Sequence, residues 1–380
     1  MTIEEFRQKQ SLPYELKIAH AEVKAIEFYN HVAGMGADCH VSVGGLDSIT
    51  LLCFLRHIGL KDVPAISVST LEDLSNQEVH RQLGVIRIKP YKSQTQVLHE
   101  LGFPVISKAK ANKIEYLLTP NADKQTFIHA IMTGDMGAQG GFKHSDRIKL
   151  QDKWIKLFGG NYADMRPDLC IMPPPDFKVS AKCCYYMKEK PCDDWAKEHN
   201  SFPYLGLMAS EGGQREMALM KNGCNYYGKE TIRSAPFAIF SRQDLLQLAI
   251  DLKVPVPRAY GTIERAENGQ LYTTRAQRTG CSMCGFGIHM EKRPHRFDRL
   301  RQDNPKLWDY WMNRCCKDEN GTLYGWGRVL DWIGVKWRDE IPIDKYEQLA
   351  LFGTAPENHA DIKTPVTYAT TQQAVYHSTE

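Results

Sequence analysis

The chain has 380 residues, of which 42% are hydrophobic and 24% charged, so it is long enough for a large α/β domain plus a smaller unit. Lys and Arg number 48 against 45 Asp and Glu, and the net charge of +3 excludes a strongly basic nucleic-acid binder while leaving room for a local basic groove. No apolar run is long enough to cross a bilayer, and the polar, acidic start predicts a cytoplasmic protein with no signal peptide and no membrane partner. Eleven cysteines in a reducing compartment favour metal ligation or thiol chemistry over disulfides.

Helices and strands alternate over the first ninety residues. Apolar residues at helical spacing predict a helix over 14–33. The patterns that follow predict a strand at 38–43, a helix at 48–59, a strand at 63–70, a helix at 75–84 and a strand at 85–90. This alternation predicts an α/β fold, a parallel twisted sheet with helices on both faces.

After residue 90 the pattern of predicted helices and strands is less regular. Gly and Pro over 130–180 predict loops at the sheet edge, whereas 203–261 returns to α/β character. Asn268-Gly269 predicts a hairpin within 265–275, and 296–335 has a helical pattern. The polar tail is expected to be largely disordered.

A glycine-rich motif, Gly44-Gly45-Leu46-Asp47-Ser48, stands between a predicted strand and helix. Glycines let the backbone approach an anion closely, and the N–H groups at a helix start point toward it. Ser48 can donate a hydrogen bond, and Asp47 can cap the helix or hold Mg²⁺. A strand–turn–helix junction without a ligand explains the motif equally well. It is neither a Walker A loop nor a dinucleotide-binding GxGxxG.

Two cysteine pairs, Cys183-Cys184 and Cys281-Ser-Met-Cys284, are candidate ligands of an iron–sulfur cluster or zinc. The adjacent pair is awkward for tetrahedral zinc, and Lys182, Lys188 and Lys190 would offset the charge of a thiolate-bound cluster. The alternative is four buried cysteines acting as small hydrophobic residues.

The other cysteines are weaker candidates. Cys315-Cys316 is a rival pair, expected on a helix. Apolar surroundings predict core positions for Cys39, Cys53 and Cys170. Cys192 is undecided, and Cys224 is a possible sulfur-handling thiol.

The glycine-rich motif resembles the SGGxDS loop of the PP-loop ATP pyrophosphatases, which cleave ATP between the α- and β-phosphates. Val43 stands where that family has Ser, although Ser42 lies one residue earlier. Leu46 stands where many members have Lys; the branch that resembles phosphoadenosine phosphosulfate (PAPS) reductase also lacks this Lys.

Further motifs resemble the same branch in the same order. Thr70 and Glu72 match a segment near the nucleotide, and 206–215 resembles G-x-R-A-x-E-S-x-x-R. In the latter, Glu211 and Arg215 form either a helix salt bridge or an Arg fork on a phosphate or sulfate. Segments 235–260 and 296–308 also match. The former is expected to be architectural, and Ser241 followed by Asp244 in it predicts a helix N-cap box. The paired cysteines resemble the CC…CxxC pattern of [4Fe–4S] adenylylsulfate reductases.

The resemblance covers about residues 37–335 and implies four parts: an N-terminal helix (1–36), a PP-loop nucleotide-binding α/β domain (37–262), a cluster-completing hairpin and helical region (263–340) and a tail (341–380). It implies ATP, Mg²⁺ and a [4Fe–4S] cluster. Catalytic roles fall on Asp47, Ser48 and Arg215, nucleotide binding on Ser42, Gly44, Gly45, Asp47, Ser48, Thr70, Glu72 and Glu211, and cluster ligation on Cys183, Cys184, Cys281 and Cys284.

The sequence lacks the cysteine nucleophile of the sulfonucleotide reductases, which makes a reductase activity the weaker expectation. Sulfonucleotide reductases of this fold attack with a cysteine near the C-terminus, whereas no cysteine here follows Cys316. The pattern is closest to iron–sulfur sulfurtransferase subunits of DNA phosphorothioation systems. It implies adenylation of an acceptor oxygen on a DNA backbone phosphate, with a cysteine desulfurase as sulfur donor.

Three alternatives stay open. The chain could be an adenylylsulfate or PAPS reductase. It could also bind nucleotide without catalysis, which the departures at Val43, Leu46, Met208 and Gly212 would suit. The basic clusters at 108–113 and 292–296 could contact phosphates or be solvated faces.

Overall fold

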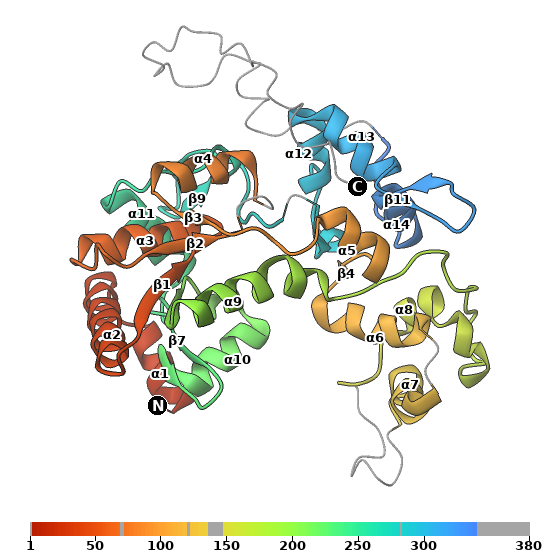
Figure 1. The fold of residues 1–380 in the computed structure, drawn as a ribbon, viewed down its shortest axis with the longest axis horizontal. Coiled ribbons are helices and arrows are strands. Elements are labelled where there is room, and N and C mark those ends of the chain that lie inside the picture. The colour runs from red at the N-terminus through yellow and green to blue at the C-terminus, as the bar shows by residue number, and fades with distance from the viewer. Residues whose placement is uncertain (1, 69–71, 120–121, 136–146, 282, 340–380) are drawn as a thin grey trace, which may run out of the picture. The chain divides into compact units, whose positions relative to one another are not determined.

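The computed structural model describes residues 2–68, 72–119, 122–135, 147–281 and 283–339. Its first elements are α1 (Ile3–Gln10), α2 (Tyr14–Gly34), β1 (Asp38–Ser42), α3 (Leu46–His57), β2 (Ala65–Ser67), α4 (Leu74–Gln82) and β3 (Ile86–Arg87) (Figure 1). Every helix and strand predicted before residue 90 is confirmed, with strands shorter than predicted. Thr70 and the predicted tail lie outside the described residues.

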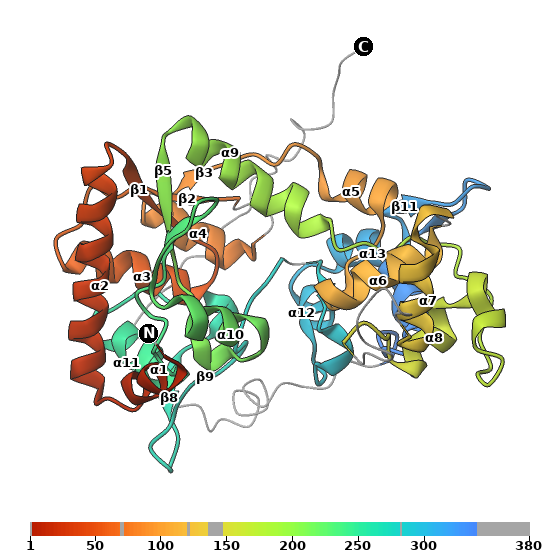
Figure 2. The ribbon, with the colours of Figure 1, turned by 90° about the horizontal axis from the view of Figure 1, so that it is seen from below.

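A six-stranded, mostly parallel sheet is the centre of the first part of the chain. It adds β5 (Ser201–Leu205), β6 (Asn225–Tyr227) and β7 (Ile232–Ser234), in the order β3-β2-β1-β5-β7-β6. All pairs are parallel except β6 with β7, and Val41 of β1 lies between Ala65 and Tyr204. Helices flank the sheet on both sides (Figures 1 and 2), including α10 (Gly213–Asn222) and α11 (Arg242–Asp251). The predicted α/β fold class is confirmed.

The strand order creates a natural ligand position. After β1 the chain moves to β2 on one side, and the later strand β5 lies on the other side of β1. The sheet therefore has its topological switch point between β1 and β5, and ligands of open α/β sheets bind beyond the carboxyl ends of strands at such a point. The glycine-rich motif follows β1 there, and the 206–211 segment follows β5.

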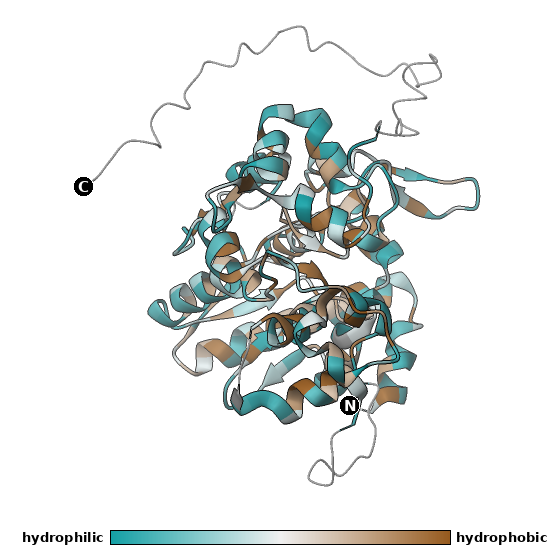
Figure 3. Ribbon diagram, turned by 90° about the vertical axis from the view of Figure 1, so that its right-hand side faces the viewer, coloured by the Kyte–Doolittle hydropathy of each residue, from teal (hydrophilic) through white to brown (hydrophobic). Residues whose placement is uncertain are grey.

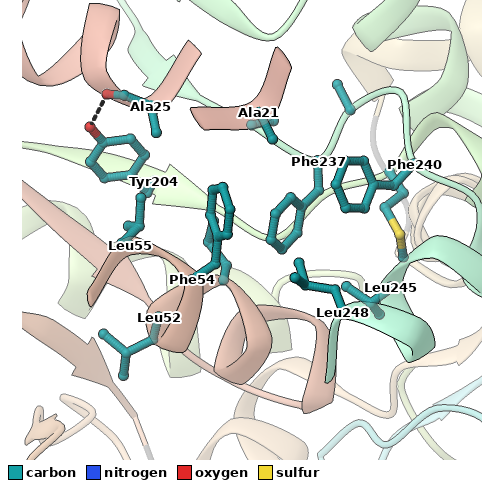
Figure 4. Close-up of a cluster of buried hydrophobic side chains, with 14 of the residues drawn as sticks. Ala21, Ala25, Leu52, Phe54, Leu55, Tyr204, Phe237, Phe240, Leu245 and Leu248 are labelled. Carbon is teal, nitrogen blue, oxygen red and sulfur yellow. Dashed lines mark hydrogen bonds between the residues drawn. The ribbon is translucent and has the colours of Figure 1, made fainter. Parts of the chain in front are cut away.

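The core of this part packs α3 and α11 against the residues between β7 and α11. Phe54, Phe237 and Phe240 are nearly or fully buried and lie side by side (Figure 4), with ring centroids 5.3 Å apart for Phe54 and Phe237. On the opposite side Tyr204 donates a hydrogen bond of 2.7 Å to the carbonyl oxygen of Ala25. Burial of each such side chain contributes about 1.5–3 kcal/mol, so this core fixes the strand ends that carry the site.

A second hydrophobic core lies outside the sheet. It is built by β4 (Val105–Ile106), α5 (Gln94–Leu101), α6 (Lys108–Leu118), α7 (Gln125–Thr133), α8 (Asp152–Phe158), β10 (Gly285–Phe286), α12 (Arg296–Asp303), α13 (Pro305–Asn313) and α14 (Trp326–Trp332). The stretch 130–180, predicted as loops, contributes α8, whose Trp154, Ile155 and Phe158 are buried. Helices in Figure 3 carry both hydrophobic and hydrophilic residues, as expected of helices packed on a core.

The later sequence predictions have mixed outcomes. The hairpin is confirmed as β8 (Ile263–Arg265) with β9 (Leu271–Thr273), and Gly269 takes a φ of +81° in its turn. Cys315 and Cys316 were wrongly expected on a helix: α13 ends at Asn313, Cys315 lies in a bend, and Cys316 pairs in β11 (Cys316–Lys317) with β12 (Leu323–Tyr324). Cys170 was wrongly expected in the core, because it is exposed in an irregular segment. Within the described part of the chain, no helix has the length and apolar character needed to cross a membrane.

Candidate active site

The side chain of a serine stabilises the loop between β1 and α3 through hydrogen bonds within the loop. The hydroxyl of Ser48 accepts a hydrogen bond of 2.8 Å from the Gly44 N–H and donates one of 2.9 Å to the Gly45 carbonyl oxygen. Leu46 N–H donates to the Tyr260 hydroxyl at 3.0 Å. Among the described residues, the N–H groups of Asp47 and Ser48 have no acceptor, because the first turn of a helix leaves its N–H groups unpaired. These groups can bind an anion.

The loop is packed tightly from two sides. A Cβ placed on Gly206, just beyond β5, would lie 2.9 Å from the backbone N and Cα of Ser48. A Cβ on Gly45 would lie 2.3 Å from the Tyr260 hydroxyl oxygen. Glycine is required at Gly206 because the contacts there are with backbone atoms, whereas a side chain at Gly45 would displace the Tyr260 hydroxyl from its hydrogen bond with Leu46. Ser42 remains in β1, paired with Ile66 and Leu205.

Two carboxylates and three arginines form ion pairs beside the loop. Asp47 forms an ion pair with Arg242, and Glu211 pairs with Arg215 and, at 3.4 Å, with Arg278. Burial raises the pKa of Asp47, although Arg242 opposes the rise, and the nearby Glu211 adds to it. Glu211 ends the 3₁₀ turn η6 (Ala209–Glu211) and Arg215 lies in α10, so their ion pair joins two elements and leaves both the salt-bridge and the phosphate-fork interpretation as predictions.

Arg242 and Tyr260 are site residues that the sequence interpretation treated as architectural. Arg242 is the first residue of α11, where a positive charge opposes the helix dipole. Such a placement signals a nearby anionic partner, here Asp47. The predicted capping box of Ser241 and Asp244 is confirmed, and it fixes the start of the helix that carries Arg242.

A hydrogen-bond chain leads from the loop to the cysteines. Tyr260 and Thr279 hydroxyls lie 2.8 Å apart, Asn76 donates to Thr279 at 3.0 Å, and Asn76 also contacts Glu72 at 3.4 Å. Glu72, which is 5% exposed, forms an ion pair with Lys188. The pKa of Lys188 is raised: burial lowers it, but Glu72 and then the Cys281 thiol raise it more. The Glu72 and Lys188 side chains therefore connect the phosphate loop with the thiols.

The two predicted cysteine pairs come together in the structure. Cys183 and Cys184 directly precede the π-helix η5 (Tyr185–Glu189), and Cys281 and Cys284 share a turn. Burial raises the pKa of each of these thiols, and the neighbouring cysteines raise it further. The pKa of Cys281 rises to about 11.

The fit of a metal group to these thiols can be tested on the same residues. Within the described residues, no three His, Cys, Asp or Glu side chains converge closely enough to hold a single metal ion. A four-iron cluster binds each thiolate to a different iron and therefore needs wider spacing than one ion. Four soft thiols, of which Cys183 is buried and the other three are partly buried, lie beside the Lys188 ammonium and fit such a cluster in their chemistry.

The remaining cysteines are placed differently. Cys315 and Cys316 are buried in the second core with their sulfurs 4.0 Å apart. Cys224 is buried in the first core, and burial raises its pKa to about 11, which makes it a poor sulfur-handling thiol. Cys192 packs in a small apolar group together with Cys183 and Cys281.

Comparisons with known proteins find little. No protein-family model matches the chain. No curated protein matches it. Solved structures similar to it include phosphoadenylyl-sulfate (PAPS) reductase from Candida auris in a phosphate complex, with 12% identity and a TM-score of 0.31 over 65% of this chain and 91% of that one. So distant a likeness says nothing about substrate.

Proposed function

We propose that this chain is a PAPS reductase-like ATP pyrophosphatase that binds ATP at the Gly44–Ser48 loop, adenylates an acceptor oxygen and so prepares it for sulfur transfer. The observation that supports this most is the loop's position: it lies at the switch point of the sheet, with two helix N–H groups unpaired among the described residues. The group of four thiols linked to it through Glu72 and Lys188 supports the sulfur chemistry.

The adenylation step uses positioning and charge. The acceptor oxygen attacks the α-phosphorus of ATP, a P–O bond forms, the bond to the β-phosphate oxygen breaks, and pyrophosphate leaves. The N–H groups of Asp47 and Ser48 would hold phosphate oxygens, and Arg242 would offset the developing charge. Asp47 and Glu211 are the carboxylates available for Mg²⁺, which commonly takes one or two carboxylates plus phosphate oxygens.

The second step replaces AMP by sulfur. A sulfur nucleophile at the oxidation level of sulfide forms the P–S bond, and AMP departs with the bonding electrons. We propose a DNA backbone phosphate as the acceptor and a cysteine desulfurase as the source of sulfur, which it delivers as a persulfide that a two-electron thiol reductant cleaves to sulfide. Cys183, Cys184, Cys281 and Cys284 would hold a [4Fe–4S] cluster, which when bound supplies soft sulfur and one-electron chemistry. Lys188 would balance its charge while touching Glu72.

The first experiment is anaerobic purification of the wild type and of Cys281→Ala, with iron and sulfide measured and the absorption spectrum recorded. We expect about four irons per chain in the wild type and their absence from the variant. Cys224→Ala is the control, because Cys224 is a buried cysteine that lies in the first core, apart from the four thiols. A colourless wild type would refute the cluster.

Adenylation is tested separately by ATP–pyrophosphate exchange and by pyrophosphate release with DNA as acceptor. We expect release that depends on both Mg²⁺ and DNA, and that disappears in Asp47→Asn. Nucleotide binding without any pyrophosphate release would refute the enzymatic proposal and favour a non-catalytic protein of this fold.

A further inference from the structure

Two neighbouring helices of the second core carry a concentration of positive charge. The segments 108–118 and 147–158 contain seven Lys or Arg residues and two acidic residues, whereas the whole chain has a net charge of +3. They form α6 and α8, which pack against each other. The buried faces use Ala111, Ile114 and Leu117 of α6 and Trp154, Ile155 and Phe158 of α8, so the lysines point away from the core.

Three of these lysines, Lys110, Lys113 and Lys153, face one another, and among the described residues none of them forms an ion pair with a carboxylate. Lys110 Nζ donates to the neutral amide oxygen of Gln151 at 3.1 Å, and Lys113 Nζ donates to the backbone carbonyl oxygen of Arg147 at 2.6 Å. Lys153 lies over the ring of Trp154 at 4.5 Å. Burial and then the neighbouring lysine lower the pKa of Lys110 and of Lys113. Positive charges held this close raise the free energy of the folded chain unless an anion joins them.

The two carboxylates of these segments are turned to other partners. Glu115 pairs with Lys182 at 2.6 Å. Asp152 pairs with Lys149 at 3.1 Å and Arg166 at 3.2 Å. Within the described ranges, neither Glu115 nor Asp152 pairs with Lys110, Lys113 or Lys153.

Ring nitrogens in the same place also lack partners. His289 in the 3₁₀ turn η8 (Ile288–Met290) packs edge-on against Trp154, with centroids 5.4 Å apart. Its pKa is lowered by burial and then by Lys153 and Lys110, which places it beside both lysines. Trp154 is 3% exposed, and among the described residues its Nε1 has no hydrogen-bond partner, nor has Nδ1 of His289.

The lysine group adjoins the thiols. His289 is five residues beyond Cys284, and the intervening strand β10 pairs with β4, which directly precedes α6. At the start of α6, Lys108 forms an ion pair with Glu189 of η5 and acts on the charge of Cys184. A partner bound along α6 would therefore lie next to the cysteines.

We propose that Lys110, Lys113, Lys153 and His289 form a surface that binds the phosphate backbone of a nucleic acid and brings it to the thiol group. The shared chemistry is a chain of phosphodiesters read without regard to sequence. Its role in presenting an acceptor phosphate rests on the proposed function, whereas binding itself does not.

The character of this surface favours a nucleic acid over a membrane. The exposed positions between Lys110 and Lys113 and between Lys149 and Lys153 are the polar Asn112 and Gln151, and the apolar Met290 beside His289 is also exposed. A helix that lies in a membrane interface places apolar residues beside its lysines. The cations are also spread over two helices, which suits an extended polyanion better than a single small anion.

The test is a salt titration of binding to fluorescent DNA duplex, single-stranded DNA and RNA, without ATP. The variant combines Lys110→Gln, Lys113→Gln and Lys153→Gln. Each lysine–phosphate interaction that the variant no longer makes lowers the slope of log K against log salt by about 0.9, so the slope falls by about 2.7. If the plots of log K against log salt for the wild type and the variant meet at 1 M salt, the variant binds up to about 500-fold more weakly than the wild type in 0.1 M salt.

A matched control combines Lys61→Gln, Lys229→Gln and Lys253→Gln, three exposed lysines that remove the same charge elsewhere. We expect it to retain nearly the wild-type slope. Equal reductions in both variants would overturn the proposal, as would wild-type binding to anionic lipid vesicles but to none of the nucleic acids. The three nucleic-acid arms identify which backbone is preferred.

A measurement on the wild type removes any dependence on folding of the variant. Acetylation of surface lysines, read by mass spectrometry, should slow at least severalfold at Lys110, Lys113 and Lys153 when DNA is added, but not at Lys61. Unchanged reactivity at the three lysines would overturn the proposal. DNA binding with this protection but no pyrophosphate release would refute the proposed enzymatic activity and leave the binding surface intact.

Discussion

Replacing Gly206 by alanine changes the contact between the two chain segments that meet at the switch point. The new Cβ would lie 2.9 Å from Ser48 N and Cα and 3.0 Å from Asp47 C. Carbon atoms in favourable contact are about 3.5–4.0 Å apart, so one segment must move by roughly 0.5–1 Å. Ser48 is held by two hydrogen bonds within its loop, which makes this movement costly.

We expect Gly206→Ala to lower the free energy of unfolding by about 1–3 kcal/mol, the usual cost of overpacking. ATP binding, measured by isothermal titration calorimetry, should weaken at least tenfold because the shifted loop no longer directs its N–H groups at the phosphates. Gly34→Ala is the control: nothing lies within 4 Å of its added Cβ. At that helical position alanine should stabilise the chain by up to about 1 kcal/mol. A Gly206→Ala protein with wild-type stability and ATP affinity would refute the close packing at the switch point.

Three further substitutions test the site and the sheet. Ser48→Ala removes both loop hydrogen bonds and should cost about 1–3 kcal/mol in urea unfolding, with weaker ATP binding; an unchanged midpoint would contradict the loop geometry. Lys188→Met leaves the buried Glu72 without its cation and should cost about 2 kcal/mol or more, whereas Lys190→Met, in an exposed pair, should cost under about 1 kcal/mol in the same assay. Burial lowers the pKa of His40 from 6.5 to about 4, so the unfolded chain binds the proton more readily than the folded chain. The folded chain therefore loses about 3 kcal/mol of stability as the pH falls from 6.5 to 4. In urea unfolding at these two pH values, His40→Gln should lack this part of the pH dependence.

Local signals explain what could be predicted from the sequence. The apolar period over 14–33, the short strand ending in two glycines and the Ser241 capping box each depend on residues within one element. The sheet class followed from their alternation. The two cysteine pairs were predicted as one group because the motif resemblance joined them, and the structure brings their thiols together.

The contacts that complete the site could not be predicted in this way. Arg242 and Asp47 are 195 residues apart, Tyr260 and Leu46 are 214 apart, and Lys188 and Glu72 are 116 apart. Neither the hydrophobic periodicity of the sequence nor its turn-forming residues relate positions that are this far apart. The helix α8 was missed for a different reason: its apolar face spans only Trp154, Ile155 and Phe158, within a Gly- and Pro-rich stretch that dominates the pattern.

The ion pairs around the loop determine which charged side chains must change partners when a nucleotide binds. Asp47 is paired with Arg242, Glu211 with Arg215 and Arg278, and Glu72 with Lys188, so carboxylates and cations already balance one another. ATP brings negative phosphates together with Mg²⁺. Under the proposed function, Mg²⁺ would take the carboxylates of Asp47 and Glu211 while their arginines turn to the phosphates, an exchange that leaves no buried charge unpaired. Because Glu72 keeps Lys188 in that exchange, the link from the loop to Cys281 would persist while the nucleotide is bound.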